Sequence, residues 1–522
     1  MAKRVAIIGA GMSGLLACKY TLQKGFDPIV FESDDGVGGV WRHTIASTEL
    51  QNTREAYQFS DFPWPSSDAD NAHPKHHQVL EYLQSYADHF GIVRHIRFGS
   101  KVIGIEYVGE HYEEMEKWVL WGGTGNAFGL KGKWHVRVQN VKTNIIEVYQ
   151  VDFVILCLGL YTGSPNIPVL PPDQGPELFD GTVMHSVDFS AMDDPSAAEL
   201  VKNKRIIVIG SKKTAMDIAS ECAIANGPEY PCTIIQRTAH WAIPRDKFFA
   251  ICMAFLYFNR FSEFFFHKPG EPLLVSLLAT LLAPFRWGSS KLAEFYLRWR
   301  LPLRKFGMIP NHSFSQDISS CDACTLPEKF YDRIEEGSIV IRKLSKSFGF
   351  CKEGITIDGS SVPIETDIVF YATGYRADKK FRSIFESSYF QKLIARPSTG
   401  LLPLYRQVIH PRIPQLAVLG YAESFSVLYA NEIRCQWLVQ LLDGKFQLPS
   451  ISDMENEVSV WEDFMVKQNG KSRRACNLNL SIWYNDQLCK DIGCEPRRRK
   501  GFLSDLFIPY GPKDYVNLSD KS

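Results

Sequence analysis

The hydrophobic pattern of the chain repeats one arrangement twice: a short apolar strand, a glycine-containing turn, a helical stretch and a second apolar strand. The first copy starts with Arg4–Ile8 and closes with Pro28–Glu32. The second copy starts with Arg205–Ile209 and closes with Cys232–Arg237. Because a strand, a helix and a parallel strand are the unit of doubly wound sheets, the pattern predicts an α/β protein with two Rossmann-like dinucleotide-binding domains.

Further apolar strands indicate how the two domains are connected. Phe153–Leu158 precedes the second copy, whereas Asp367–Tyr371 and Gln415–Leu419 follow it. We expect both late strands to return to the first sheet, so that the second domain is inserted into the first. The expected limits are 1–165 for the first part of the first domain and 166–325 for the second domain. Residues 326–450 are expected to form the remaining part of the first domain, and 451–522 a C-terminal helical extension.

An aromatic-rich stretch at about 246–320 is expected to form a helical insertion in the second domain. Its apolar runs Phe248–Phe258 and Leu273–Phe285 hold 11 and 13 residues, fewer than the roughly 18 that a membrane-spanning helix needs. They fit buried or interfacial helices. The insertion is either a lid over a pocket or additional helical packing, and the sequence leaves both open.

The first glycine turn has the spacing of the dinucleotide fingerprint between a strand and a helix. Gly9 allows the tight turn, Gly11 lets the backbone approach a pyrophosphate, and Gly14 allows close packing of helix on strand. Glu32 ends the next strand, where an acid hydrogen-bonds an unphosphorylated ribose. FAD and NAD both carry such a ribose. The predicted site comprises Gly9, Ala10, Gly11, Met12, Ser13, Gly14 and Glu32.

The second turn departs from the fingerprint, because Lys212 and Ala215 replace its second and third glycines. Alanine is tolerated at the third position, and Arg237 ends the following strand, where an arginine accommodates a ribose 2′-phosphate. One site therefore carries an acid and the other a base, which predicts FAD at the first and NADPH at the second. The predicted NADPH site comprises Gly210, Ser211, Lys212, Lys213, Thr214, Ala215, Arg237 and Thr238.

Composition narrows the range of functions. The 522 residues hold 58 basic and 58 acidic side chains, so no global charge favours a nucleic-acid partner. The basic run Arg497–Lys500 fits a solvated surface patch. Twelve cysteines show no framework spacing, and no further ligand pair completes a zinc site around Cys321 and Cys324. We expect reduced thiols in a cytosolic setting and no metal site.

NADPH beside FAD indicates hydride transfer to the flavin, which must then pass its electrons on. The span Gly36–Tyr86 contains no cysteine, which argues against a disulfide reductase. Dioxygen is the expected acceptor, giving a C4a-hydroperoxyflavin that donates one oxygen atom. Two other classes stay open: an uncoupled NADPH oxidase that releases hydrogen peroxide, and a non-catalytic binder that lost NADPH through Lys212.

Several segments resemble the flavin-containing monooxygenases, most closely their plant branch, over nearly the whole chain. The turn Gly9–Gly14 is followed by Gly38–Trp41, which looks like the family's second flavin segment. Phe179–Ser190 resembles the monooxygenase signature, although Ser190 stands where the family has Lys or Asp. Ala372–Tyr375 is similar to the late linker motif, and Phe59–Pro65 to a plant-branch segment. Phe189 stands where Baeyer–Villiger relatives place Trp, which argues against ketone oxygenation.

The resemblance implies further site residues. Gly39, Val40, Trp41, Thr373 and Gly374 would contact the flavin. In many family members an Asn near the flavin contacts the oxygenated intermediate. Proximity assigns this role to Asn52, whereas counting back from Ser60 and Asp61 gives Gln51. Both side chains are amides and keep the hydrogen-bonding capacity.

The resemblance also implies partners: dioxygen and a small amine or sulfide. The segments around Asn52 are most similar to the amine N-hydroxylating branch, with a cyclic or aliphatic amine such as pipecolate as the expected substrate. Thioether S-oxygenation and decarboxylating oxidation of a keto acid are the alternatives. The expected location is cytoplasmic, with peripheral contact at the endoplasmic reticulum compatible with the apolar runs.

Overall fold

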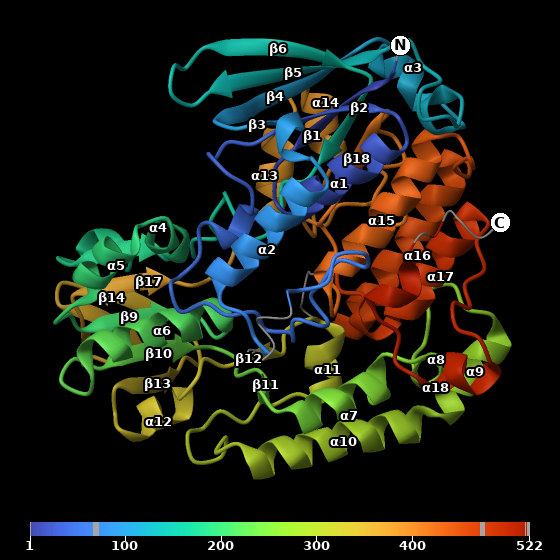
Figure 1. Ribbon diagram of the computed structural model, residues 1–522. Helices are drawn as coiled ribbons and strands as arrows, with labels where there is room; N and C mark the ends of the chain where they lie inside the picture. The colour runs from blue at the N-terminus through green and yellow to red at the C-terminus, as the bar shows by residue number, and fades with distance from the viewer. Residues whose placement is uncertain (1, 66–71, 470–474, 517, 519–522) are drawn as a thin grey trace.

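Two parallel five-stranded sheets form the framework of the computed structural model, which describes residues 2–65, 72–469, 475–516 and 518 (Figure 1). The first sheet has the order β18-β7-β1-β2-β3, from Leu416–Val418, Phe153–Leu156, Arg4–Ile8, Asp27–Phe31 and Ile96–Arg97. The second has the order β13-β10-β9-β17-β8, from Ile339–Lys343, Cys232–Gln236, Ile206–Ile209, Ile368–Tyr371 and Thr182–His185. These sheets confirm the predicted α/β class with two dinucleotide-binding domains.

Burial on both faces explains why the strands of the first sheet are apolar throughout. Val5 and Ile7 of β1 pack into one cluster with helix α1 (Met12–Gln23), whereas Ala6 and Ile8 pack into another with the antiparallel β4–β6 sheet. Successive side chains of a strand point to opposite faces, so each face needs its own cover. The covering sheet consists of β4 (Ser100–Val108), β5 (Lys133–Asn140) and β6 (Ile146–Val151).

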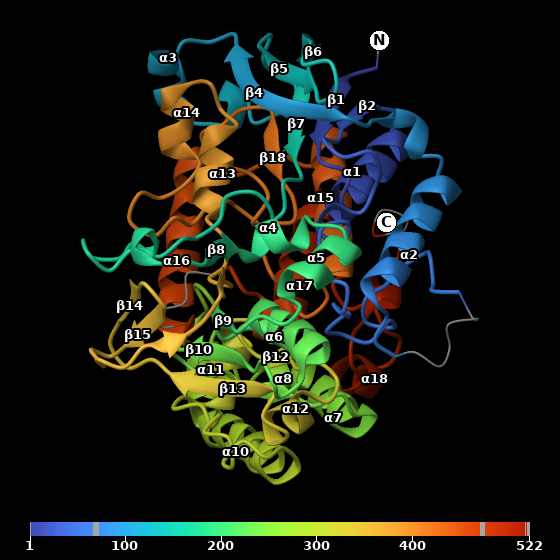
Figure 2. The ribbon, with the colours of Figure 1, turned by 90° about the vertical axis from the view of Figure 1, so that its left-hand side faces the viewer.

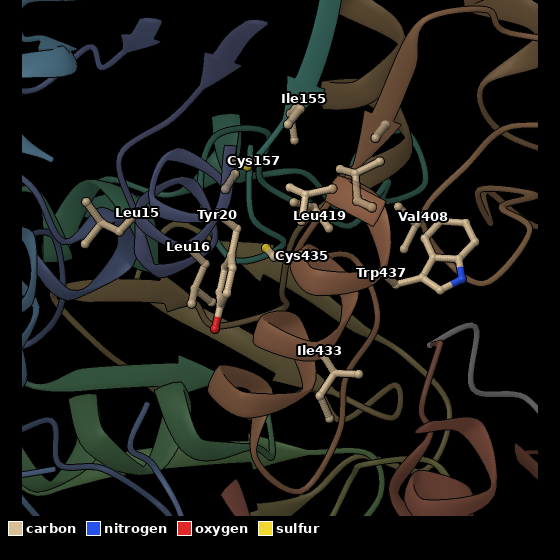
Figure 3. Packing of buried hydrophobic residues seen from close by; sticks show 14 of the residues in the cluster. Leu15, Leu16, Tyr20, Ile155, Cys157, Val408, Leu419, Ile433, Cys435 and Trp437 are labelled. Carbon is tan, nitrogen blue, oxygen red and sulfur yellow. The ribbon is translucent and has the colours of Figure 1, made fainter. Parts of the chain in front are cut away.

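Helix α15 (Val427–Leu442) completes the core beneath the first sheet. Its side chains are buried on all sides from Leu428 to Leu442, as expected for a helix inside a domain. Figure 3 shows Leu16 and Tyr20 of α1 on the side toward Cys435 of α15, with Cys157 close to Tyr20; all four belong to one buried cluster. The late chain segments are thus integral to the first domain.

Chain order shows that the second sheet is inserted into the first, because β8 to β17 all lie between β7 and β18. One expectation was wrong. The strand expected at Asp367–Tyr371 does not return to the first sheet: as β17 it pairs with β9 and β8 in the second. Only β18 returns, beside β7. We therefore propose that the second domain ends near residue 375 rather than at 325.

The remaining elements surround these sheets. The insertion at 246–320 is helical, with α7 (Lys247–Tyr257), α8 (Arg260–Glu263), α9 (Leu273–Leu281), α10 (Ala283–Arg300) and α11 (Phe314–Ser319). Other helices are α2 (His76–His89), α3 (Tyr112–Glu116), α4 (Ser186–Ser190), α5 (Asp194–Val201), α6 (Lys213–Asn226), α12 (Phe330–Glu335), α13 (Ala377–Ser383), α14 (Ser388–Leu393), α16 (Ile451–Asn469), α17 (Ser481–Ile492) and α18 (Phe502–Phe507). Short strands complete the list: β11 (Ala242–Ile243), β12 (Cys324–Thr325), β14 (Phe348–Cys351), β15 (Gly354–Ile357) and β16 (Ile364–Glu365).

Among the described residues, no single helix is both long and apolar enough to cross a membrane. The pair α9 and α10 passes that test only together, and it is bent by 45° at the break between the two helices.

Candidate active site

The first glycine turn is shaped by backbone contacts that exclude side chains. Gly9 has φ +106°, and a Cβ there would lie 2.6 Å from the carbonyl oxygen of Cys157. A Cβ on Gly14 would lie 1.8 Å from the carbonyl oxygen of Gly9. At Gly11, the nearest atom to such a Cβ is the Cα of Gly39, 3.6 Å away. The turn therefore keeps room at Gly11, where the fingerprint requires a pyrophosphate to approach.

Glu32 is buried at the end of β2 and holds the turn together. Its carboxylate accepts hydrogen bonds from the backbone N–H of Ala10 at 2.6 Å and of Asp34 at 3.0 Å. Glu32 also lines the cavity beside the turn. This placement fits the expected contact with a ribose that carries a free 2′-hydroxyl.

The segment Gly38–Trp41 folds back onto the same turn. The backbone N–H of Gly38 donates to the carbonyl of Ala10 at 3.1 Å, and the backbone of Gly38 and Gly39 adopts positive φ angles. The Trp41 indole N–H donates to the Tyr57 hydroxyl at 3.1 Å. The two flavin segments expected from the sequence, together with Val40, are thus brought to one place.

A cavity of about 1300 Å³ extends from this turn to the insertion. Its wall combines the first glycine turn and the Gly38–Trp41 segment with the first helix of the insertion and the chain entering α15. Residues from these distant segments include Met12, Ser13, Trp41, Gln51, Asn52, Arg245, Asp246, Phe249, Met253, Phe258, Asp317, Lys380, Glu423, Phe425, Val427 and Tyr429. The cavity is large enough for both a flavin ring and a small substrate.

Both candidate amides lie on the cavity wall. The Asn52 side-chain N–H donates to the carbonyl of Phe425, and the Gln51 side-chain oxygen accepts from the backbone N–H of Thr325 at 3.3 Å. Asn52 therefore ties its segment to the loop before α15, and Gln51 ties it to the second domain. Either amide keeps one polar group beyond these contacts.

Lys380 and the segment Gly420–Phe425 were missed by the sequence interpretation. The Lys380 ammonium donates to the Thr162 hydroxyl at 2.6 Å and to the Leu158 carbonyl. Burial lowers the pKa of Lys380 to about 8. Gly420 approaches Ser13 so closely that a Cβ would lie 2.6 Å from its hydroxyl. No local motif marks these residues, because they reach the site from elements hundreds of positions away.

The second glycine turn also needs its glycine, because a Cβ on Gly210 would lie 2.6 Å from the Ala372 carbonyl oxygen. The two lysines that follow are engaged in ion pairs: Lys212 with Asp322, and Lys213 with Asp217. Burial raises the pKa of Asp217, against the opposing effect of Lys213. The lysine charges near the expected phosphates are thus partly neutralised.

Arg237 directly follows β10 and is exposed, as the expected 2′-phosphate contact requires. Ser211 and Thr214 flank the start of α6, and Thr238 follows Arg237. This second turn lies outside the set of residues that line the large cavity.

Thr373 and Gly374 follow β17, where the chain leaves the second sheet, and they do not line the cavity. The Thr373 hydroxyl donates to the Asn166 carbonyl at 2.5 Å, and the Gly374 carbonyl accepts from the His185 imidazole at 3.0 Å. Burial lowers the pKa of His185, and its other ring nitrogen accepts from the Val187 backbone N–H. These contacts fit a positioning role for the linker.

Two histidines and an aspartate form a group that could hold a metal ion. The Asp317 carboxylate accepts from His312 at 2.6 Å, from His240 at 3.1 Å and from the Trp241 backbone N–H at 2.7 Å. Burial alone would raise the pKa of Asp317, but these hydrogen bonds outweigh it and hold the pKa below its ordinary value. The three groups thus satisfy one another through hydrogen bonds.

The expectation of reduced thiols needs a correction at one pair. Cys321 is bonded to Cys476 in a disulfide that joins positions 155 residues apart, with a Cα–Cα distance of 5.8 Å. Cys324, its neighbour in the sequence motif, is a buried free thiol. Sequence spacing could not reveal this pair, because folding alone brings the end of α11 beside the segment before α17.

Comparisons with known proteins identify the family of the chain. The model of the family described as "FMO-like: Flavin-binding monooxygenase-like" matches residues 2–509. A protein of Arabidopsis thaliana described as probable flavin-containing monooxygenase 1 is 40% identical over 517 residues, covering 98% of this chain and 96% of that protein. Putative flavin-containing monooxygenase 2 of the same plant is 36% identical over 496 residues, covering 94% and 98%.

A solved structure, OTEMO in complex with FAD and NADP, shares the fold with a TM-score of 0.65 at 18% identity, covering 94% of this chain and 97% of that chain. The two parallel sheets, the two glycine turns and the family match over residues 2–509 all lead to one conclusion. The chain belongs to the flavin-binding monooxygenase-like family and is an oxygen-transferring enzyme that uses FAD and NADP.

Proposed function

We propose that this enzyme uses NADPH and dioxygen to N-hydroxylate a small amine. The observation that carries the proposal is the cavity beside the first glycine turn, where an amide and a buried carboxylate meet apolar walls. When bound there, FAD accepts hydride from NADPH and supplies one oxygen atom from dioxygen. The protein then has to bind the substrate, orient it and keep water out.

Water exclusion follows from the lining of the cavity. Phe249, Met253, Phe258 and Tyr429 are buried and line it. Phe258 packs against Phe425 with ring centroids 4.1 Å apart. An apolar lining that excludes water protects a reactive oxygen species from hydrolysis. The same walls leave space for a substrate of modest size.

A buried acidic residue in the cavity favours an amine over a keto acid as the substrate. Glu423 is 7% exposed and lines the cavity two residues before Phe425, whose carbonyl Asn52 contacts. A carboxylate attracts an ammonium group and repels an organic anion. The cavity arginine, Arg245, is paired with Glu49 and so offers less charge to an anionic substrate. Thioethers carry no charge at sulfur, so Glu423 would not attract them electrostatically.

Asn52 is the residue proposed to act at the reacting centre, with Gln51 as the alternative one position back. An amide there can donate to the oxygen being transferred while its carbonyl accepts from the nicotinamide amide. Its contact with the Phe425 carbonyl fixes the side chain at the cavity wall. Orientation, rather than acid or base chemistry, is the role that this geometry supports.

The test is a substrate screen on the purified holoenzyme. Amines, thioethers and keto acids are compared by NADPH consumption and by product mass. We expect an amine product heavier by one oxygen atom, formed in proportion to the NADPH consumed. Oxygenated thioethers or decarboxylated keto acids as the main products, with amines unchanged, would refute the proposed substrate class.

A further inference from the structure

Helix α10 is an amphipathic helix whose apolar face points outward. The side facing the protein is formed by Ser290, Ala293, Glu294 and Leu297, all buried. The outward stripe repeats at three- and four-residue intervals around Gly288 and consists of Phe285, Leu292, Phe295 and Trp299, which are 66–73% exposed. A helix of a soluble protein normally has the opposite orientation, with its large apolar residues toward the core.

Neighbouring helices extend this apolar surface. Exposed large side chains lie on α7 (Phe248, Ile251 and Phe255), α9 (Leu273, Leu274, Leu277 and Leu281) and α18 (Phe502 and Leu503). In both ribbon views α7, α10 and α18 lie toward the same lower end of the molecule, and Figure 1 shows α9 beside them (Figures 1 and 2). Soluble monomers rarely expose contiguous apolar surface of this extent unless it binds something.

Helix lengths indicate contact along a surface rather than a crossing. Helix α9 has 9 residues, about half of what a membrane-spanning helix needs. Helix α10 has 18 residues but carries Arg286, Lys291, Arg298 and Arg300. Short helices with an apolar face and basic residues lie in the plane of a bilayer interface, with tryptophan and phenylalanine at headgroup level.

The charge of the insertion is opposite to that of an anionic bilayer. Residues 246–305 contain nine Lys or Arg against four Asp or Glu, in a chain whose total charge is zero. The acids are turned inward: Glu263 and Glu294 are buried, Asp246 caps α7, and Glu271 pairs with His267. Exposed positions carry bases instead, including Arg300 and Arg304. Basic residues beside an apolar face attract anionic headgroups.

We propose that α7, α9, α10 and α18 form a docking face for the surface of an anionic phospholipid bilayer, into which the apolar side chains insert without crossing it. Helix α7 separates this face from the cavity, because Phe249 and Met253 line the cavity while Phe248 and Phe255 are exposed. Docking therefore brings the wall of the active-site cavity against the bilayer surface.

Vesicle flotation of the full-length holoenzyme tests the docking face. The protein should float with vesicles of phosphatidylcholine and phosphatidylserine, and less with phosphatidylcholine alone or at high salt. The double variant Phe295→Ser/Trp299→Ser should bind at least about tenfold more weakly. Its matched control, Ile145→Ser/Val169→Ser, removes two apolar side chains that are 61% and 98% exposed elsewhere, and should bind like the wild type.

A second variant addresses charge at exposed positions, where folding is not at risk. Arg300→Glu/Arg304→Glu should weaken binding to the phosphatidylserine vesicles and leave NADPH consumption in detergent-free buffer unchanged. The proposal would be overturned if the wild-type protein floats with neither kind of vesicle. It would also be overturned if the Phe295→Ser/Trp299→Ser variant binds the vesicles as tightly as the wild type. A wild-type dimer in light scattering that the same variant converts to a monomer, without vesicle binding, would assign the face to a second copy instead.

Discussion

At the scale of single residues, Gly11 offers a direct test of the flavin site. A Cβ at Gly11 finds no protein atom closer than 3.6 Å, so Gly11→Ala should fold but obstruct the pyrophosphate. We expect lower flavin content in the purified protein, measured by absorbance. Gly14→Ala is the contrast, because its Cβ would lie 1.8 Å from the Gly9 carbonyl oxygen and should impair folding itself. Normal flavin affinity in Gly11→Ala would remove this turn from the site.

Asn52 is predicted to control coupling rather than flavin reduction. Hydride transfer needs the two rings to be stacked and oriented, and Asn52→Ala leaves that stacking possible. We expect the variant to oxidise NADPH while releasing hydrogen peroxide in place of oxygenated product. The ratio of product to NADPH measures this. Gln51→Ala is the matched control, since Gln51 lines the same cavity but contacts Thr325.

The outcomes for these two variants separate three assignments. Uncoupling in Asn52→Ala alone supports the proposed residue. Tight coupling in Asn52→Ala with uncoupling in Gln51→Ala moves the role one residue back. Tight coupling in both variants contradicts any role of this segment in the oxygenation step.

Arg237 is predicted to distinguish NADPH from NADH. A hydrogen bond to a charged group contributes about 1.5–3 kcal/mol, so Arg237→Ala should weaken NADPH binding by roughly 10- to 150-fold. NADH, which lacks the 2′-phosphate, should be little affected. Steady-state kinetics with both cofactors provide the comparison. An unchanged preference for NADPH would show that another residue contacts the phosphate.

The positions of the two glycine turns in the fold could be predicted because the strand–turn–helix pattern is encoded locally. Gly9, Gly14 and Glu32 lie within one strand–helix–strand unit, so spacing alone relates them. Lys380 and Glu423 could not be predicted, because each reaches the cavity from an element far along the chain. The sequence around a single lysine or glutamate does not indicate which residues it contacts after folding.

At the scale of elements, the sequence pattern predicts the strands but not which strands pair with one another. Both repeated units were predicted within a residue or two, since apolar periodicity defines each strand. The strand at 368–371 is apolar on both faces and fits the interior of either parallel sheet. Its place between β9 and β8 depends on where the chain can reach, which composition does not encode.

The disulfide between Cys321 and Cys476 is predicted to stabilise the contact between the insertion and the C-terminal segment. It closes a loop of 155 residues, and long loops lose most chain entropy on cross-linking. We expect Cys476→Ser to lower the thermal unfolding midpoint, and a reductant to lower that of the wild type equally. Cys324→Ser, which removes a buried free thiol, is the control whose response to reductant should match the wild type. A wild-type unfolding midpoint that does not change when reductant is added would contradict a stabilising role of the disulfide.

At the scale of the whole molecule, the positive and negative charges are equal in number but unevenly distributed along the chain. The total charge is zero, yet residues 246–305 carry an excess of five basic side chains beside exposed aromatic ones. The sequence predicted helices there, but their orientation depends on which face the rest of the fold covers. For α10 the covered face is the one with Ser290 and Glu294.

The family, the two glycine turns and the mostly apolar cavity together imply that one atom of dioxygen reaches the substrate. Turnover of the holoenzyme with an accepted amine under ¹⁸O₂, with NADPH followed in parallel, tests this most directly. The account predicts one ¹⁸O atom in each hydroxylated product molecule and one NADPH consumed per product. Product without ¹⁸O, or NADPH consumption that yields only hydrogen peroxide across the amines, thioethers and keto acids, would contradict it.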